Sequence, residues 1–125
     1  MKFFTIEEAN RLLPKVRQIL IRLRLANGVV ASMREDAKLA SSAAERGGGG
    51  MIQGASYVGA LTVMAAKSRE LDEMGVQIKD FERGLIDFPA MRDGKVVLLC
   101  WQLGENEELS WWHDVDAGFA GRQPL

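Results

Sequence analysis

The chain has 125 residues, of which 47% are hydrophobic and 26% are charged, and these are ordinary values for a globular protein of one domain. The net charge of -1 is too small to favour nucleic acid or an anionic membrane as a partner. The single cysteine, Cys100, excludes an intrachain disulfide and a metal site built only from cysteines. No apolar run reaches the roughly 18 residues of a membrane-spanning helix, and the first residues lack the form of a signal peptide. We therefore expect a cytoplasmic protein with no membrane partner.

The first predicted helix begins after Thr5, which forms a capping box with Glu8. Pro14 lies inside the helical pattern and has no backbone N–H, so it predicts a kink or a one-turn break. Apolar residues recur at the three- and four-residue steps of a heptad seam. They are Leu12, Val16, Ile19, Leu23, Ala26, Val30, Met33, Ala37 and Ala40.

Four consecutive glycines, residues 47–50, predict the turn of a helical hairpin that spans residues 1–75. The second helix is predicted from about Ile52 to Met74, and Gly75 is expected to cap its end. This helix is shorter than the first and cannot cover its N-terminal half. That half has to pack on the sheet or on a second subunit, and we expect a homo-oligomer, in the simplest case a dimer.

The hydrophobic period becomes strand-like after Gly75. Residues 76–81 and 85–88 are predicted strands, and Pro89 restricts the second of them to a sheet edge or a strand end. Asp93-Gly94 favours a type I′ hairpin turn.

The next strand, residues 96–103, is apolar on both faces and is therefore expected at the centre of the sheet. A last strand is predicted at residues 109–112. The fold class is α+β, with a long antiparallel helical hairpin, a small sheet of three to four antiparallel strands within residues 76–113, and an irregular tail at 114–125.

Charge is distributed unevenly along the chain. Residues 1–24 hold six basic and two acidic residues, whereas residues 104–125 hold five acidic and one basic residue. We expect these oppositely charged regions to meet, within one chain or across a dimer.

The only histidine, His113, has carboxylates close to it in the sequence, a combination that suits a divalent metal ion or general acid–base chemistry. The candidate metal ligands are His113, Asp116 and Glu105, and Asp87 and Glu8 are alternatives for the third position. The competing interpretation is a histidine that hydrogen-bonds a neighbouring carboxylate at the sheet edge.

Tryptophans and arginines near the end of the chain form a second candidate site. Trp111 and Trp112 are adjacent and must point to opposite faces of a strand, which leaves one of them half exposed. Half-exposed tryptophans are common at interfaces and ligand pockets, and arginines bind anions. The candidate ligand-binding residues are Trp101, Trp112, Arg92 and Arg122. Packing in the core or in a dimer interface is the alternative.

Cys100 lies in the most apolar predicted strand, so a buried and unreactive thiol is expected. A Cys100–His113 pair across adjacent strands is the alternative.

Four blocks, residues 4–10, 87–94, 99–105 and 112–125, resemble a widespread bacterial family of small stand-alone proteins, domain of unknown function 2203. The last block ends in the specific string Gly-Phe-Ala-Gly-Arg-Gln-Pro-Leu. The resemblance covers essentially the whole chain and implies a bacterial, cytoplasmic protein, but no activity. Two functions are therefore expected as alternatives. One is a noncatalytic interaction module that self-associates through its long helix, and the other is a small-molecule or metal-binding protein, an enzyme included, with its site in the sheet and tail.

Overall fold

The computed structural model describes the backbone of residues 1–42 and 50–125 and the side chains of residues 1–36 and 54–125. Residues 47–49 of the predicted glycine turn lie outside this part. The elements are α1 (Ile6–Ser42), α2 (Gly50–Met74), β1 (Gln77–Asp80), β2 (Leu85–Arg92), β3 (Lys95–Gln102), β4 (Trp111–Asp114), the short 3-10 helix η1 (Phe119–Gly121) and β5 (Gln123–Pro124). The strands form one antiparallel sheet in the order β1-β2-β3-β4-β5. The predicted α+β class is confirmed, with five strands in place of three to four.

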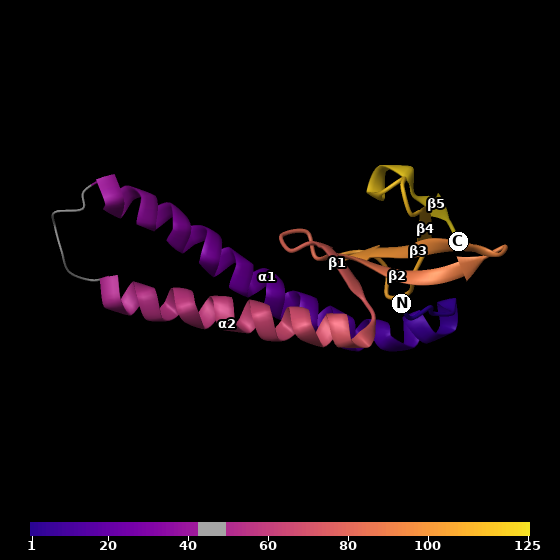
Figure 1. Cartoon of the computed structure of the whole chain (residues 1–125), viewed down its shortest axis with the longest axis horizontal. Coiled ribbons are helices and arrows are strands. Elements are labelled where there is room, and N and C mark those ends of the chain that lie inside the picture. Colours follow the sequence, from indigo (N-terminus) through magenta and orange to yellow (C-terminus); the bar gives the residue numbers. More distant parts are fainter. Residues whose placement is uncertain (43–49) are drawn as a thin grey trace.

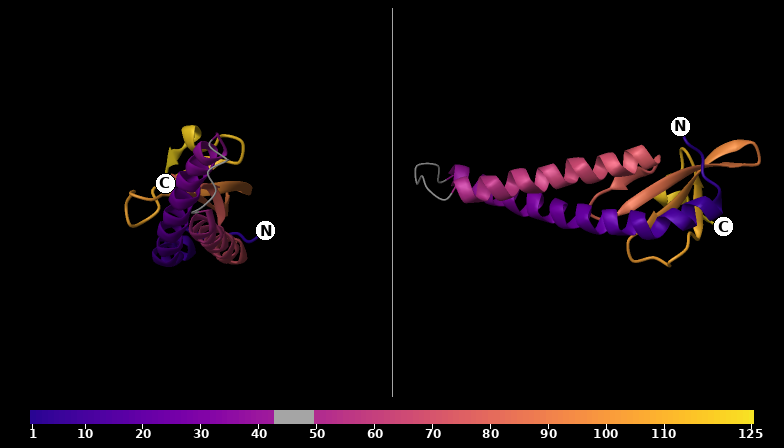
Figure 2. Two further views of the ribbon diagram at one scale, coloured as in Figure 1. Left: turned by 90° about the vertical axis from the view of Figure 1, so that its left-hand side faces the viewer. Right: turned by 90° about the horizontal axis from the view of Figure 1, so that it is seen from below.

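The sheet lies between two layers. The first half of α1 packs under one face, and the C-terminal tail with η1 covers the opposite face (Figure 1). The rest of the helical hairpin projects beyond the sheet (Figure 2). We call this projecting part, residues 25–36 of α1 and 54–63 of α2, the distal arm. None of the helices in the described part of the chain is both long and apolar enough to cross a membrane.

The first half of α1 is buried by the sheet. The Thr5 hydroxyl accepts a hydrogen bond from the Glu8 N–H at 3.0 Å, as the capping signal predicts. Leu13, Val16 and Leu20 are fully buried in one cluster with α2 and the sheet. The sheet residues of that cluster are Ile86, Phe88, Ala90, Val97, Leu99 and Trp101. The sheet is therefore the surface that covers this half of α1, and no second subunit is required there.

Helix α1 is continuous through Pro14, so the predicted break is wrong. Proline removes one backbone hydrogen bond from the helix. Leu13 and Val16, on either side of Pro14, are fully buried, and burying two such side chains contributes about 1.5–3 kcal/mol each. This burial outweighs the missing hydrogen bond and holds both sides of the proline in one helix.

Helix α2 ends as the sequence predicts. Gly75 has φ of 85°, its N–H donates to the carbonyl of Asp72, and the N–H of Val76 donates to the carbonyl of Leu71. This is the Schellman motif, and glycine takes the left-handed position at low cost.

The hairpin of β2 and β3 is also confirmed. Asp93 and Gly94 have φ of 51° and 76°, the two positive values that a type I′ turn needs. Strand β3 is the third of five strands and is buried along most of its length, as its apolar sequence predicts.

Pro89 lies inside β2, but at a place where β2 has no neighbour from β1. The last β1 pairing on β2 is at Asp87, and the carbonyl of Pro89 accepts a hydrogen bond from the Phe4 N–H at 2.8 Å. The N–H and C=O groups of one residue in an antiparallel strand point to the same side. The missing N–H of Pro89 therefore costs no hydrogen bond to β3.

The last predicted strand is displaced by two residues, because β4 begins at Trp111 and not at Leu109. The Leu109 N–H instead donates to Asn10 Oδ1 of α1 at 2.7 Å. The two oppositely charged regions do approach each other here, and Arg17 donates to the carbonyl of Glu107 at 3.5 Å. Within the described residues, however, no ion pair joins residues 1–24 to residues 104–125.

Candidate functional site

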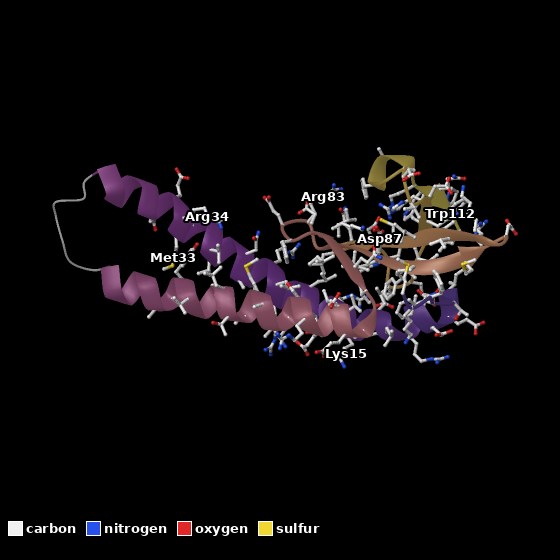
Figure 3. All side chains as sticks on the ribbon, in the orientation of Figure 1. Lys15, Met33, Arg34, Arg83, Asp87 and Trp112 are labelled. Atoms are coloured by element: carbon white, nitrogen blue, oxygen red, sulfur yellow. The ribbon has the colours of Figure 1, made fainter. Side chains whose placement is uncertain are left out.

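Three polar side chains meet on the sheet face that the tail covers. Asp87 of β2 pairs with Cys100 of β3, and His113 of β4 pairs with Leu98, two residues before Cys100. Paired residues and those two apart share a face, so all three side chains point away from α1. Their exposed fractions are 1%, 1% and 3% respectively. One potential ligand atom from each lies within 4.8 Å of the other two. Figure 3 shows Asp87 on the sheet beneath the tail.

Both ring nitrogens of His113 face oxygen atoms. Nδ1 lies 2.7 Å from the carbonyl oxygen of Asp114, and this oxygen can only accept, so Nδ1 carries a hydrogen. Nε2 lies 3.0 Å from Oδ1 of Asp87. A neutral ring with its hydrogen on Nδ1 directs the Nε2 lone pair at a carboxylate oxygen. Either a proton or a metal cation therefore has to lie between Nε2 and Oδ1.

Cys100 does not have the setting of a nucleophile. Burial, with the nearby Asp87 carboxylate as a second cause, raises the pKa of the Cys100 thiol to about 12. The structure does bring His113 close to Cys100, but both imidazole nitrogens already have oxygen partners. A base for the thiol is missing from this arrangement, which does not favour covalent catalysis by a cysteine–histidine pair.

A small cavity of about 160 Å³ adjoins the three side chains. Lys79 stands at its rim, with Nζ 3.9 Å from Asp87 Oδ2. The tail supplies its far wall through Val115, Gly118 and Phe119. Gly118 has φ of 65°, a conformation that favours glycine and lets the chain turn back over the sheet.

The structure joins only one of the three predicted metal ligands to this cluster. His113 is in it, Asp116 is exposed in the turn after β4, and Glu105 holds Arg122 through both carboxylate oxygens at 2.9 and 2.7 Å. The alternative ligand Asp87 is the carboxylate that meets His113. Glu8, the other alternative, lies in the first turn of α1, on the far side of the sheet.

The four predicted ligand-binding residues are divided between the two faces of the sheet. Trp101 is buried on the α1 side, where Trp112 also packs against the core, and the guanidinium of Arg92 lies 4.6 Å from the centre of the Trp112 ring. Arg122 lies on the tail side, 5.0 Å from the centre of the Trp111 ring. The structure does not bring these residues into one pocket.

Sequence reasoning missed that Cys100 belongs with Asp87, although a signal for it exists. A two-residue type I′ turn at Asp93-Gly94 pairs Arg92 with Lys95 and, by counting back along both strands, Asp87 with Cys100. The position of His113 has no such signal, because the irregular segment 103–110 separates β3 from β4.

The distal arm carries a second feature, which is an uncharged stretch on each of its helices; the charged residues of the arm are Arg34, Glu35 and Asp36. Residues 51–66 of α2 and 25–33 of α1 contain no Asp, Glu, Lys or Arg. Between residues 54 and 66, all side chains except Tyr57, Ala60 and Met64 are exposed. Leu25 and Val58 are exposed by 68% and 60%. Leu61 is exposed, while the neighbouring Ala60 faces α1.

A shallow groove of about 480 Å³ runs along this surface between the two helices. Arg22 and Ser56 stand at the margins of the groove. The small and apolar residues that line the rest of it are Leu25, Ala26, Val29, Gly59, Ala60 and Val63.

A family model described as an uncharacterized conserved protein matches residues 2–125, essentially the whole chain. No curated protein and no solved structure matches the chain.

Proposed function

We propose, from the premise that the chain belongs to the uncharacterized conserved protein family DUF2203, that it is an interaction module that forms a homodimer through the distal arm. The observation that carries the proposal is the exposed helical surface without charge. A helix that is apolar on all sides is normally covered by other protein, and a large exposed apolar patch marks an interaction site. The run from residue 54 to residue 66 rises by about 20 Å, and only Tyr57, Ala60 and Met64 in it are shielded from solvent within one chain.

The surface also suits close helix packing. A Cβ atom added at Gly28, Gly54 or Gly59 would meet no atom within 4 Å, so these glycines leave room on the outside of the arm. Glycine in an exposed helix costs about 1 kcal/mol relative to alanine. Small residues instead let neighbouring helices approach each other closely, and three glycines on one short arm favour a partner helix at this surface.

The occupant we propose is a second copy of the same arm. Two arms in antiparallel contact make a four-helix bundle with two-fold symmetry. Arg22, at the margin of the groove, and Asp36 are 14 residues apart in α1, which is about four helical turns, so they share a face of the helix. In the antiparallel arrangement, Arg22 of each copy comes level with Asp36 of the other. The uncharged stretch between them allows the two copies to pack without like-charge repulsion.

Sedimentation of the full chain at micromolar concentrations tests the proposal. We expect a dimer for the unchanged protein and a monomer for Val29→Glu combined with Val63→Glu, because each copy then brings unpaired carboxylates into an apolar interface. Met91→Glu is the matched control, since Met91 is exposed by 51% at the opposite end of the molecule, and it should remain dimeric.

Exchange of the two charges tests the antiparallel arrangement separately. Asp36→Arg alone should weaken the dimer, and adding Arg22→Asp should restore it. Circular dichroism of each variant checks that the helices are intact. A monomeric unchanged protein at high micromolar concentration contradicts the proposal as a whole. If Val29→Glu combined with Val63→Glu remains dimeric, the dimer interface does not lie on the distal arm.

The proposal also assigns this dimer to the bacterial cytoplasm, in line with the resemblance of the sequence blocks. Fractionation of bacterial cells that express the chain is the check on this assignment.

A further inference from the structure

We propose that Asp87, Cys100 and His113 bind one divalent transition-metal ion, for which Zn²⁺ is the best match, and that its fourth ligand position opens into the cavity beneath the tail. This site is independent of the proposed dimer, because it lies on the sheet and not on the distal arm (Figure 3).

The positions of the three side chains fit a tetrahedral ion. Ligand bonds of about 2.0–2.3 Å separate neighbouring ligand atoms of tetrahedral zinc by roughly 3.3–3.8 Å. The three ligand atoms here all lie within 4.8 Å of one another, and His113 Nε2 lies 3.0 Å from Asp87 Oδ1. Ligand atoms as far apart as 4.8 Å have to approach each other by about 1 Å to reach these separations. The three ligands come from three adjacent strands, which hold their backbone positions rigidly.

The second ring nitrogen of His113 has the partner that a metal-bound histidine requires. Histidines that ligate metals through one nitrogen almost always donate the N–H of the other to a carbonyl or carboxylate. His113 Nδ1 donates to the Asp114 carbonyl at 2.7 Å. This hydrogen bond fixes the ring and leaves the Nε2 lone pair directed at the side of Asp87.

The charges of the proposed site balance. A carboxylate, a thiolate and a neutral imidazole around a divalent ion have no net charge, which is what a buried position favours. On binding, the ion displaces two protons, one from the Cys100 thiol and one from between His113 and Asp87. Thiolate and imidazole ligands together favour zinc and its transition-metal neighbours over magnesium and calcium.

The cavity provides the fourth position. Its volume of about 160 Å³ exceeds the roughly 10–15 Å³ of accessible space that one water molecule needs. Lys79 Nζ, 3.9 Å from Asp87 Oδ2, orients the carboxylate oxygen that does not face His113. Three protein ligands and one open position are the arrangement of zinc sites that accept water or a small ligand.

Cobalt spectroscopy tests the site on the full chain without an affinity tag. The protein is treated with a chelator and then titrated with Co²⁺, which replaces zinc in such sites. We expect a thiolate-to-cobalt absorption band together with the visible bands of tetrahedral Co²⁺, and their loss on adding Zn²⁺. Because Cys100 is the only cysteine, a thiolate band reports this residue alone.

Variants and melting curves complete the experiment. His113→Gln, Asp87→Asn and Cys100→Ser should each weaken Co²⁺ binding by at least about 100-fold. Zn²⁺ should raise the melting temperature of the unchanged protein but not of these three variants. Asp116→Asn is the matched control, since Asp116 is an exposed carboxylate outside the cluster, and it should bind normally. A titration of the unchanged protein without a thiolate band overturns the proposal even where a variant fails to fold. Undiminished binding by His113→Gln overturns it as well.

Discussion

Asp87 is a carboxylate in a strand whose residues from Leu85 to Ala90 are all buried. An unpaired charge at such a position costs several kcal/mol. His113 faces one of its oxygens at 3.0 Å, and Lys79 approaches the other at 3.9 Å. The same contacts that neutralise Asp87 therefore fix the directions of its two oxygens. A single residue in this cluster cannot be replaced without changing the charge balance of the others.

Arg122 shows how the tail is held at the level of one side chain. Its guanidinium forms two hydrogen bonds with Glu105 and stacks 4.5 Å from the centre of the Phe119 ring. Arg83 lies 4.2 Å from the centre of the same ring, so two cations contact Phe119. These contacts hold the tail over the Asp87–Cys100–His113 cluster.

Gly84 provides a prediction at this scale. It has φ of 61°, and an added Cβ would lie 2.4 Å from Leu103 Cδ1. Gly84→Ala therefore combines backbone strain of about 1–2 kcal/mol with overpacking of similar size. We expect its melting temperature to fall by roughly 8 °C or more.

Gly94→Ala is the matched comparison for Gly84→Ala. Gly94 has φ of 76°, but an added Cβ would meet no atom within 4 Å. This variant reports the backbone strain alone, and its melting temperature should fall by roughly half as much as that of Gly84→Ala. Equal losses in the two variants would refute the steric role of Leu103.

At the scale of the element, α1 combines two environments in one helix. Its first half is buried between the sheet and α2, and its second half contacts only α2 in the part of the chain that the structure describes. The buried cluster of the second half is small, with Ala26, Val30 and Ala60 as its members. The helix is therefore anchored at one end, and its projecting end depends on the second arm of the hairpin and on any partner.

Pro14 leads to a prediction for this element. It is exposed on a continuous helix, where alanine restores the hydrogen bond to the Asn10 carbonyl and fits the helix better. Pro14→Ala should stabilise the protein by about 1–2 kcal/mol after allowing for the greater freedom of its unfolded chain. Thermal or urea unfolding measures the change.

Gln18→Ala is the control for that variant, since Gln18 is an exposed position one turn further along α1. It should change stability by less than about 0.5 kcal/mol. A destabilised Pro14→Ala would mean that the proline has a packing role that its exposure does not reveal.

At the scale of the whole molecule, the distal arm and the rest of the protein, which we call the body, are stabilised to different degrees. The body combines a large buried core with a five-stranded sheet, and the arm has a pair of helices and a small cluster. Met33 and Arg34 on the arm lie far from Asp87 and Trp112 on the sheet (Figure 3). Regions with few buried apolar contacts open at a lower free energy than the core.

Hydrogen exchange at two protein concentrations gives the prediction at this scale. In dilute solution, amides of the distal arm should exchange much faster than those of β2 and β3. At high concentration the proposed dimer should slow exchange in the arm and leave the sheet unchanged. Exchange in the arm that does not depend on concentration would argue against the dimer.

The elements with strong local signals could be predicted from the sequence. The cap at Thr5, the Schellman end at Gly75 and the turn at Asp93-Gly94 all appear where the residues indicate them. The continuity of α1 through Pro14 and the start of β4 could not, because burial on the sheet decides the first and a hydrogen bond from the Leu109 N–H to Asn10 Oδ1 decides the second.

The sequence by itself determined the order of the two helices and of strands β1 to β4, and the two-residue turn at Asp93-Gly94 contains the register that pairs Asp87 with Cys100. These features depend on backbone preferences and on a fixed count of residues between them. Only the tertiary structure decided that the sheet covers the first half of α1, that His113 joins Asp87, and that Glu105 binds Arg122 instead. These contacts join segments that are connected by irregular loops, and the spacing of residues along such loops does not fix where the segments meet.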